Sequence, residues 1–137
     1  MVAMKKCLVS ACLVGLCTRY DGCSKADRYC RDHLQGFFWI PICPEQLGGL
    51  PTPRTPADLS GGDGLAVLAG RARVIDRNGL DVSERFILGA RQVLRIAQAQ
   101  NIRLAFLKDR SPSCGLSPRL GVTAALLQQH GIHCIAC

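Results

Sequence analysis

Residues 83–107 read SERFILGARQVLRIAQAQNIRLAFL, and this stretch decides the fold class. Apolar side chains recur at helical spacing from Ser83 to about Gln100, which predicts an amphipathic helix. The apolar positions of this helix are Phe86, Ile87, Ala90, Val93, Leu94 and Ala97. Residues 103–107 (RLAFL) then predict a strand, since four apolar residues follow Arg103. A helix that leads directly into a buried strand is typical of proteins with a parallel sheet.

The same alternation of helix and strand continues on both sides of this stretch. Further strands are predicted at 5–11, 37–42 and 132–136, and further helices at 24–35 and 122–130. Ser24 is the expected N-cap of the first helix and Gly36 its stop. Pro41 marks residues 37–42 as an edge strand or as a strand that ends there. The pattern predicts an α/β fold: a single-domain, Rossmann-like open parallel sheet of about four strands flanked by helices, over residues 1–137.

The middle of the chain carries a different composition. Residues 44–64 are rich in proline and glycine, which predicts a long loop without regular structure, and loops of this length in compact domains are often functional. In residues 65–75 (LAVLAGRARVI), the residue types alternate on either side of Gly70, and this pattern predicts a small hairpin. The DRNG sequence at 76–79, directly after this segment, contains the residue types that favour turns.

Composition narrows the class of protein. The chain has 137 residues, of which 48% are hydrophobic and 20% charged, as in compact globular proteins. No apolar run is long enough to cross a bilayer, and residues 1–10 do not resemble an export signal, so we expect a cytoplasmic protein. Nine cysteines in a reducing compartment indicate metal binding, redox work or catalysis rather than disulfides. The formal net charge of +7 suits an anionic small molecule such as a nucleotide.

Three cysteines follow predicted strands. Cys12 follows the first strand, Cys43 follows the second, and Cys114 follows the strand that ends at Leu107. Ligands of open parallel sheets bind at the carboxyl ends of the strands, so these thiols are expected to meet at one edge. Thiolate sulfur prefers zinc, copper(I) or iron–sulfur centres. The spacing leaves the choice among them open.

Two alternative classes remain at this point. One is a zinc-stabilised, non-enzymatic binding module, in which Cys17 or Cys23 would complete a four-ligand site. The other is a thiol redox protein, which the absence of a CxxC pair disfavours.

Four segments carry a resemblance to a known family. They read VSACLVGLCTRYDG (9–22), ICPEQLGGLPTPRTPADL (42–59), LKDRSPSCG (107–115) and GVTAALLQQHGI (121–132). In this order they resemble the thiouracil desulfurase family, long known only as a domain of unknown function. The resemblance implies a [4Fe–4S] cluster held by Cys12, Cys43 and Cys114, with one iron free of protein ligands.

The resemblance also implies an activity. The expected enzyme is an iron–sulfur-dependent, non-redox desulfidase that hydrolyses the C=S bond of thiouracil or 4-thiouridine monophosphate to C=O and releases hydrosulfide. Its partner is a small thiopyrimidine or its nucleotide, with no stable nucleic-acid partner and no membrane. A close alternative is a desulfidase that acts on 4-thiouridine within tRNA, although 137 residues leave little room for an RNA-binding domain.

Residue roles follow from the matching segments. Glu45 lies two residues after Cys43, and a carboxylate beside an apolar metal-bearing pocket is a candidate general base, while a loop carboxylate in solvent is the alternative. The resemblance implies the catalytic role for Glu45 and implicates a serine before Cys114, either Ser111 or Ser113. Arg54 is the first choice for a substrate phosphate because guanidinium groups bind phosphate bidentately. The other candidate substrate-binding residues are Ser10, Tyr20 and Lys108.

Overall fold

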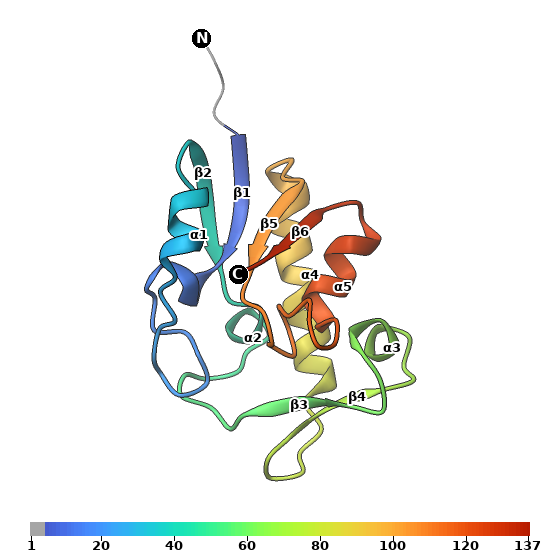
Figure 1. Ribbon diagram of the computed structural model, residues 1–137. Helices are drawn as coiled ribbons and strands as arrows, with labels where there is room; N and C mark the ends of the chain where they lie inside the picture. The colour runs from blue at the N-terminus through green and yellow to red at the C-terminus, as the bar shows by residue number, and fades with distance from the viewer. Residues whose placement is uncertain (1–4) are drawn as a thin grey trace.

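The structure, a computed structural model, describes residues 5–137 (Figure 1). Residues 1–4, part of the N-terminal segment interpreted above as lacking an export signal, lie outside the described residues. The elements in chain order are β1 (Lys5–Ser10), the 3-10 helix η1 (Ala11–Val14), α1 (Arg28–His33), β2 (Phe37–Ile42), α2 (Pro44–Leu47), β3 (Ala57–Ser60), α3 (Gly64–Leu68), β4 (Arg73–Asp76), α4 (Ser83–Ala99), β5 (Leu104–Leu107), α5 (Val122–Gln129) and β6 (His133–Ala136).

Four strands form one sheet in the order β2-β1-β5-β6, and every neighbouring pair is parallel. The predicted α/β class with an open parallel sheet is therefore confirmed. β2 is an edge strand, paired with β1 from Lys5↔Phe37 to Ser10↔Ile42. Pro41 has no backbone N–H to donate to a neighbouring strand. An edge strand can contain such a residue because it pairs with a neighbour on one side only.

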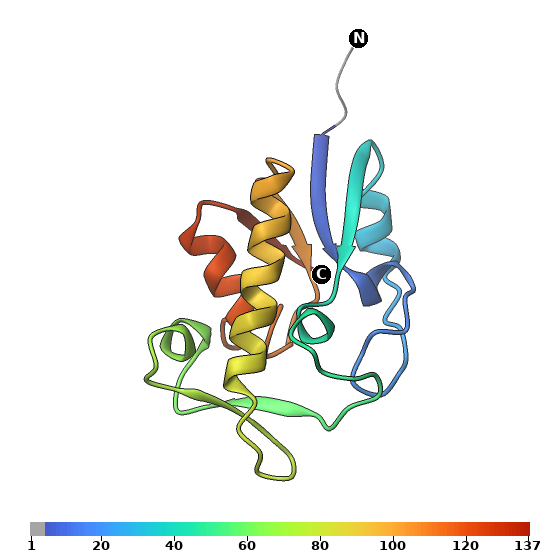
Figure 2. The same ribbon diagram turned by 180° about the vertical axis from the view of Figure 1, so that it is seen from behind.

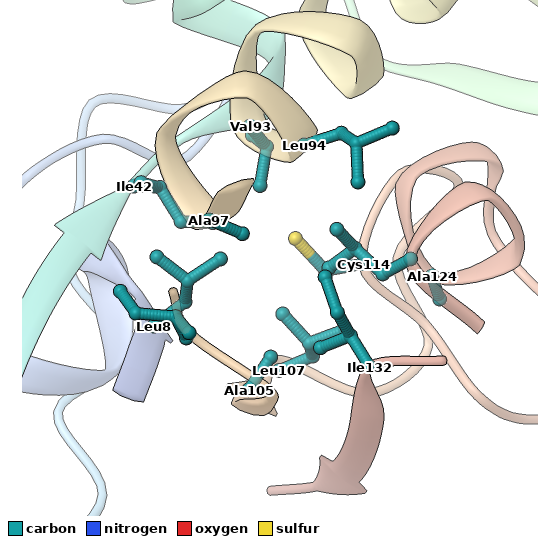
Figure 3. Close-up of a cluster of buried hydrophobic side chains, with 12 residues drawn as sticks. Leu8, Ile42, Val93, Leu94, Ala97, Ala105, Leu107, Cys114, Ala124 and Ile132 are labelled. Carbon is teal, nitrogen blue, oxygen red and sulfur yellow. The ribbon is translucent and has the colours of Figure 1, made fainter. Parts of the chain in front are cut away.

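Alternation of side chains along the strands divides the core between the two faces of the sheet. Leu8 and Ala105 belong to the cluster under α4 and α5, which Figure 3 shows in close-up. Val9 and Phe106, the next residue on each strand, pack on the other face with Cys30 of α1. Figures 1 and 2 show α1 on one side of the sheet and α4 on the other. Helices thus lie on both faces of the sheet, as the apolar parts of its central strands require.

The longest predicted helix is confirmed, whereas the first helix is shorter than expected. α4 runs from Ser83 to Ala99. α1 covers only Arg28–His33, and its N-cap is Asp27, whose carboxylate accepts a hydrogen bond from the N–H of Tyr29 at 3.0 Å. Asp27 and Ser24 are both favourable N-cap residues, so sequence pattern alone did not separate them.

The proline- and glycine-rich middle is more regular than predicted. Residues 44–64 contain the short helix α2 and the strand β3. The small hairpin exists, but β4 pairs in antiparallel register with β3. The prediction that 65–75 folds back on itself was wrong, because residues 64–68 form the helix α3. The Asp63 side chain caps α3 by accepting the N–H of Ala66, and a short apolar run does not distinguish a helical turn from a strand.

Close glycine contacts hold α2 against α4. A Cβ atom at Gly89 of α4 would overlap the carbonyl oxygen of Pro44, and one at Gly48 would overlap the carbonyl oxygen of Arg85. The two backbones can therefore approach only because both positions lack side chains. α2 begins directly after Cys43 and contains Glu45, so this contact sets the position of two candidate site residues.

Replacing Gly89 with alanine is expected to destabilise the protein and displace α2. The obstacle is backbone, which cannot rotate away, so the overpacking cost of about 1–3 kcal/mol should exceed the gain in helix propensity of about 1 kcal/mol. Chemical denaturation measures the change in unfolding free energy. Arg91→Ala, an exposed change on the same helix, is the control. An unchanged stability of Gly89→Ala would contradict this packing.

Candidate active site

A cavity of about 580 Å³ opens at the carboxyl ends of the parallel strands. Its walls come from the segments that follow β1, β2 and β5 and from the β3–β4 hairpin. Figure 1 shows the hairpin crossing beneath this edge of the sheet. The volume is typical of small-molecule sites, and the location is the usual binding edge of an open parallel sheet.

The three predicted cysteines all line this cavity. Cys12 lies in η1 after β1, Cys43 is the N-cap residue of α2 after β2, and Cys114 lies in the segment after β5. Cys12 and Cys114 are buried, and Figure 3 shows Cys114 among the side chains of the apolar core. The thiol of Cys43 is half-buried and donates to the carbonyl oxygen of Thr18 at 3.7 Å. The structure thus brings together three thiols that are far apart in sequence.

Cys12 and Cys114 are shielded from solvent, and the Ser113 hydroxyl donates to the Cys114 sulfur at 3.8 Å. Burial raises the pKa of Cys114 to about 12, and the thiols of Cys43 and Cys12 add to this effect. Burial also raises the pKa of Cys12, again with a contribution from Cys43. All three thiols line the same cavity, after three neighbouring strands of the parallel sheet.

The donor set indicates which metal group can fit. Within residues 5–137, no three or more cysteine, histidine, aspartate or glutamate side chains lie close enough together to hold a single metal ion. A four-iron cluster is wider than one ion, because each thiolate binds a different iron atom of the cube. The donor chemistry of three soft thiols around one cavity fits a thiolate-bound iron–sulfur cluster.

Cys17 and Cys23, the possible additional ligands of a zinc site, lie elsewhere. Both are exposed and neither lines the cavity. The Cys23 thiol donates to the carbonyl oxygen of Asp21 at 3.9 Å. All nine cysteines lie within the described residues and are free thiols.

Glu45 lies in the same cavity, in contact with the serine segment. Its Oε2 accepts a hydrogen bond from the Ser113 hydroxyl at 2.9 Å. The Ser111 and Ser113 hydroxyl oxygens are 3.0 Å apart, so Ser111 donates to Ser113 when Ser113 donates to Glu45. The Ser111 oxygen also accepts the N–H of Cys114 at 3.1 Å. A continuous hydrogen-bonded chain therefore joins a carboxylate to two hydroxyls beside a candidate ligand.

The predicted substrate-binding residues also line the cavity, with different contacts. The Ser10 hydroxyl is buried and accepts the backbone N–H of Lys108 at 2.9 Å. The ammonium group of Lys108 donates to the carbonyl oxygen of Asp109 at 2.6 Å. Tyr20 is exposed, with the Arg19 guanidinium 5.6 Å from its ring centroid. The roles of these residues in binding remain predictions.

Arg54 makes more contacts with the protein than its predicted role requires. Its Nε donates to Oε1 of Glu45 at 2.9 Å, and its Nη2 donates to the carbonyl oxygen of Thr18 at 3.0 Å. Its side chain is only 6% exposed. Binding of a substrate phosphate by Arg54 stays a prediction.

Sequence reasoning missed two cations at the cavity, Arg77 and Arg110. Both are exposed. Arg110 is part of the LKDRSPSCG segment, so its place in that motif could have indicated it. Arg77 lies in the turn after β4, and nothing in its local sequence points to the cavity.

Fold and site together define an α/β enzyme with a thiol-lined cavity at the carboxyl edge of a parallel sheet. A family model described as 2-thiouracil desulfurase matches residues 7–136. The chain belongs to the 2-thiouracil desulfurase family, as the resemblance of its motifs predicted. No helix in the described part of the chain has the length and apolarity needed to span a membrane.

Two individual proteins are similar over nearly the whole chain. An uncharacterized protein of Bacillus subtilis (strain 168), YbbK, is 39% identical over 141 residues, which cover 94% of this chain and 93% of that protein. The solved structure of the [4Fe-4S]-dependent thiouracil desulfidase TudS is also 39% identical. It superposes with a TM-score of 0.80 and covers 96% of this chain and 90% of its own.

Proposed function

We propose that this protein is a [4Fe–4S]-dependent desulfidase that hydrolyses the C=S bond of thiouracil or 4-thiouridine monophosphate. The observation that carries the proposal is the convergence of Cys12, Cys43 and Cys114 on one cavity with the Glu45–Ser113 pair. The similarity to a thiouracil desulfidase of the same fold supports it.

Cys12, Cys43 and Cys114 would hold the cluster. With three thiolate ligands, one iron would lack a protein ligand, and the bound cluster would supply a soft Lewis acid for the thiocarbonyl sulfur. The cavity around it combines apolar side chains such as Ile42 with polar and charged ones.

Glu45 would act as the general base. Its carboxylate takes a proton from the water that attacks the thiocarbonyl carbon, and the hydroxyls of Ser113 and Ser111 provide a path along which a proton can move. The oxygen of the water becomes the carbonyl oxygen, the C–S bond breaks, and the products are the pyrimidine and hydrosulfide. One proton is released, so the reaction is balanced without a change of oxidation state.

The charge of the cavity favours an anionic substituent on the substrate. Its lining includes five cationic and four acidic side chains. Each acid is engaged by the protein: Glu45 by Arg54, Asp58 by Arg119, and Asp76 and Asp109 by backbone N–H groups. The exposed Arg77 and Arg110 at the cavity are therefore suited to a phosphate, which a nucleotide carries and a free base lacks.

A panel of thiopyrimidines tests this proposal. The protein is reconstituted anaerobically with iron and sulfide and incubated with 2-thiouracil, 4-thiouracil and 4-thiouridine monophosphate, and hydrosulfide is measured. We expect release from at least one of them, and a KM for the nucleotide that rises with salt while that for a free base does not. No hydrosulfide from any of the three would contradict the proposed function.

A further inference from the structure

Arg54 is held by four hydrogen bonds within the protein. Its Nε donates to Oε1 of Glu45 at 2.9 Å, and its Nη2 donates to the Thr18 carbonyl oxygen at 3.0 Å. Its Nη1 donates to Thr52 Oγ1 at 3.0 Å and to the Pro51 carbonyl oxygen at 3.3 Å. A guanidinium has five N–H donors, so few remain for a bidentate contact with a substrate phosphate.

The surroundings of Arg54 restrict its movement. Its side chain is 6% exposed, and that of its partner Glu45 is 15% exposed. Its backbone N–H donates to the carbonyl oxygen of Tyr20 at 2.8 Å, which ties residues 51–54 to the segment after β1. Freeing the guanidinium for a ligand would leave the Glu45 carboxylate without its cation in a largely buried site, which is strongly unfavourable.

The Glu45 carboxylate is consequently held from two sides. Arg54 occupies Oε1, and the Ser113 hydroxyl occupies Oε2 at 2.9 Å. The backbone of Glu45 is fixed by the α2–α4 contact, but its side-chain torsions are fixed only by these two partners among the residues described. A general base requires such fixation, because a misplacement of about 1 Å can lower a rate by about 100-fold.

We infer that Arg54 is a positioning residue: it orients the Glu45 carboxylate toward the water that attacks the substrate. The inference rests on the proposed function. It assigns Arg54 an effect on turnover that passes through Glu45, rather than an effect on substrate affinity. The phosphate of a nucleotide substrate would then be bound by the exposed cations of the cavity, Arg77 and Arg110.

A double-mutant cycle tests this inference. Arg54→Met and Arg54→Lys are each made in the wild-type and in the Glu45→Gln background, and kcat and KM are measured on the anaerobically reconstituted proteins. Arg54→Met is expected to lower kcat by about 10–100-fold with little change in KM. Arg54→Lys should recover part of this loss, because an ammonium group keeps the charge but not the fork of donors. Neither change should lower kcat further in the Glu45→Gln background, because residues that act as a unit are not additive.

The controls separate the possible failures. Arg95→Met, an exposed change on α4, should leave both constants unaltered. Equal losses of kcat in both backgrounds, or a raised KM with unchanged kcat, would overturn the positioning role. So would loss of the cluster absorption in both Arg54 variants, since Arg54 would then support the Cys43 region instead. A wild-type protein that releases no hydrosulfide overturns the proposed function itself, and the inference with it.

Discussion

Cys43→Ala is expected to lose the iron–sulfur absorption and hydrosulfide release together. The thiol of Cys43 is half-buried, and its one hydrogen bond in the described structure is to the Thr18 carbonyl oxygen, so its removal should leave the fold intact. The same result is expected for Cys12→Ala and Cys114→Ala, at a modest stability cost of about 1 kcal/mol for the small cavity left in the core. Activity should fall to the uncatalysed rate in each case. Visible absorption, circular dichroism and hydrosulfide release measure cluster, fold and activity separately.

Two other cysteines provide matched controls. Cys17 and Cys23 are close to Cys12 in sequence but are exposed and lie outside the cavity. Cys17→Ala and Cys23→Ala should therefore keep both the absorption and the activity. If Cys17→Ala lost the cluster while Cys12→Ala retained it, the ligand assignment would be wrong.

Glu45→Gln is expected to keep the cluster and to lower kcat by about 100- to 10,000-fold, the usual contribution of a positioned general base. The amide preserves the shape of the side chain, and its oxygen can still accept the hydrogen bond from Arg54, but it does not accept a proton from water. Single-turnover assays of hydrosulfide release on the reconstituted variant measure the chemical step directly.

Glu84→Gln is the control for this substitution. Glu84 is exposed in the first turn of α4, away from the cavity, so the change should leave kcat unaltered. Normal turnover in Glu45→Gln would show that another group takes the proton and would remove the basis for the role of Arg54 as well.

The sheet could be predicted because its strands and helices have distinct periodicities. β1, β2, β5 and β6 are short apolar runs separated by helical segments, and α4 carries a clear amphipathic pattern. The position of Cys12, Cys43 and Cys114 at one edge followed from the same pattern, since each comes after a strand that runs in the same direction.

Other features depend on contacts that a local pattern does not contain. α2 is only four residues long, and it is stabilised by the glycine contact with α4 rather than by helix propensity. The pairing of β3 with β4 was missed because the partner strand lay in the segment predicted as loop. The hydrogen bond between Arg54 and Glu45 joins residues nine positions apart across an irregular turn, so the sequence favoured a surface phosphate contact instead.

The measurement that tests the central claim most directly is the iron and acid-labile sulfide content of the anaerobically reconstituted protein, with Cys12→Ala, Cys43→Ala and Cys114→Ala measured in parallel. The shared-cluster account predicts about four iron and four sulfide ions per wild-type chain, with a brown colour that air bleaches, and a large loss of both in each variant. A colourless wild-type protein that holds one zinc ion, or variants that retain the full iron and sulfide content, would contradict it.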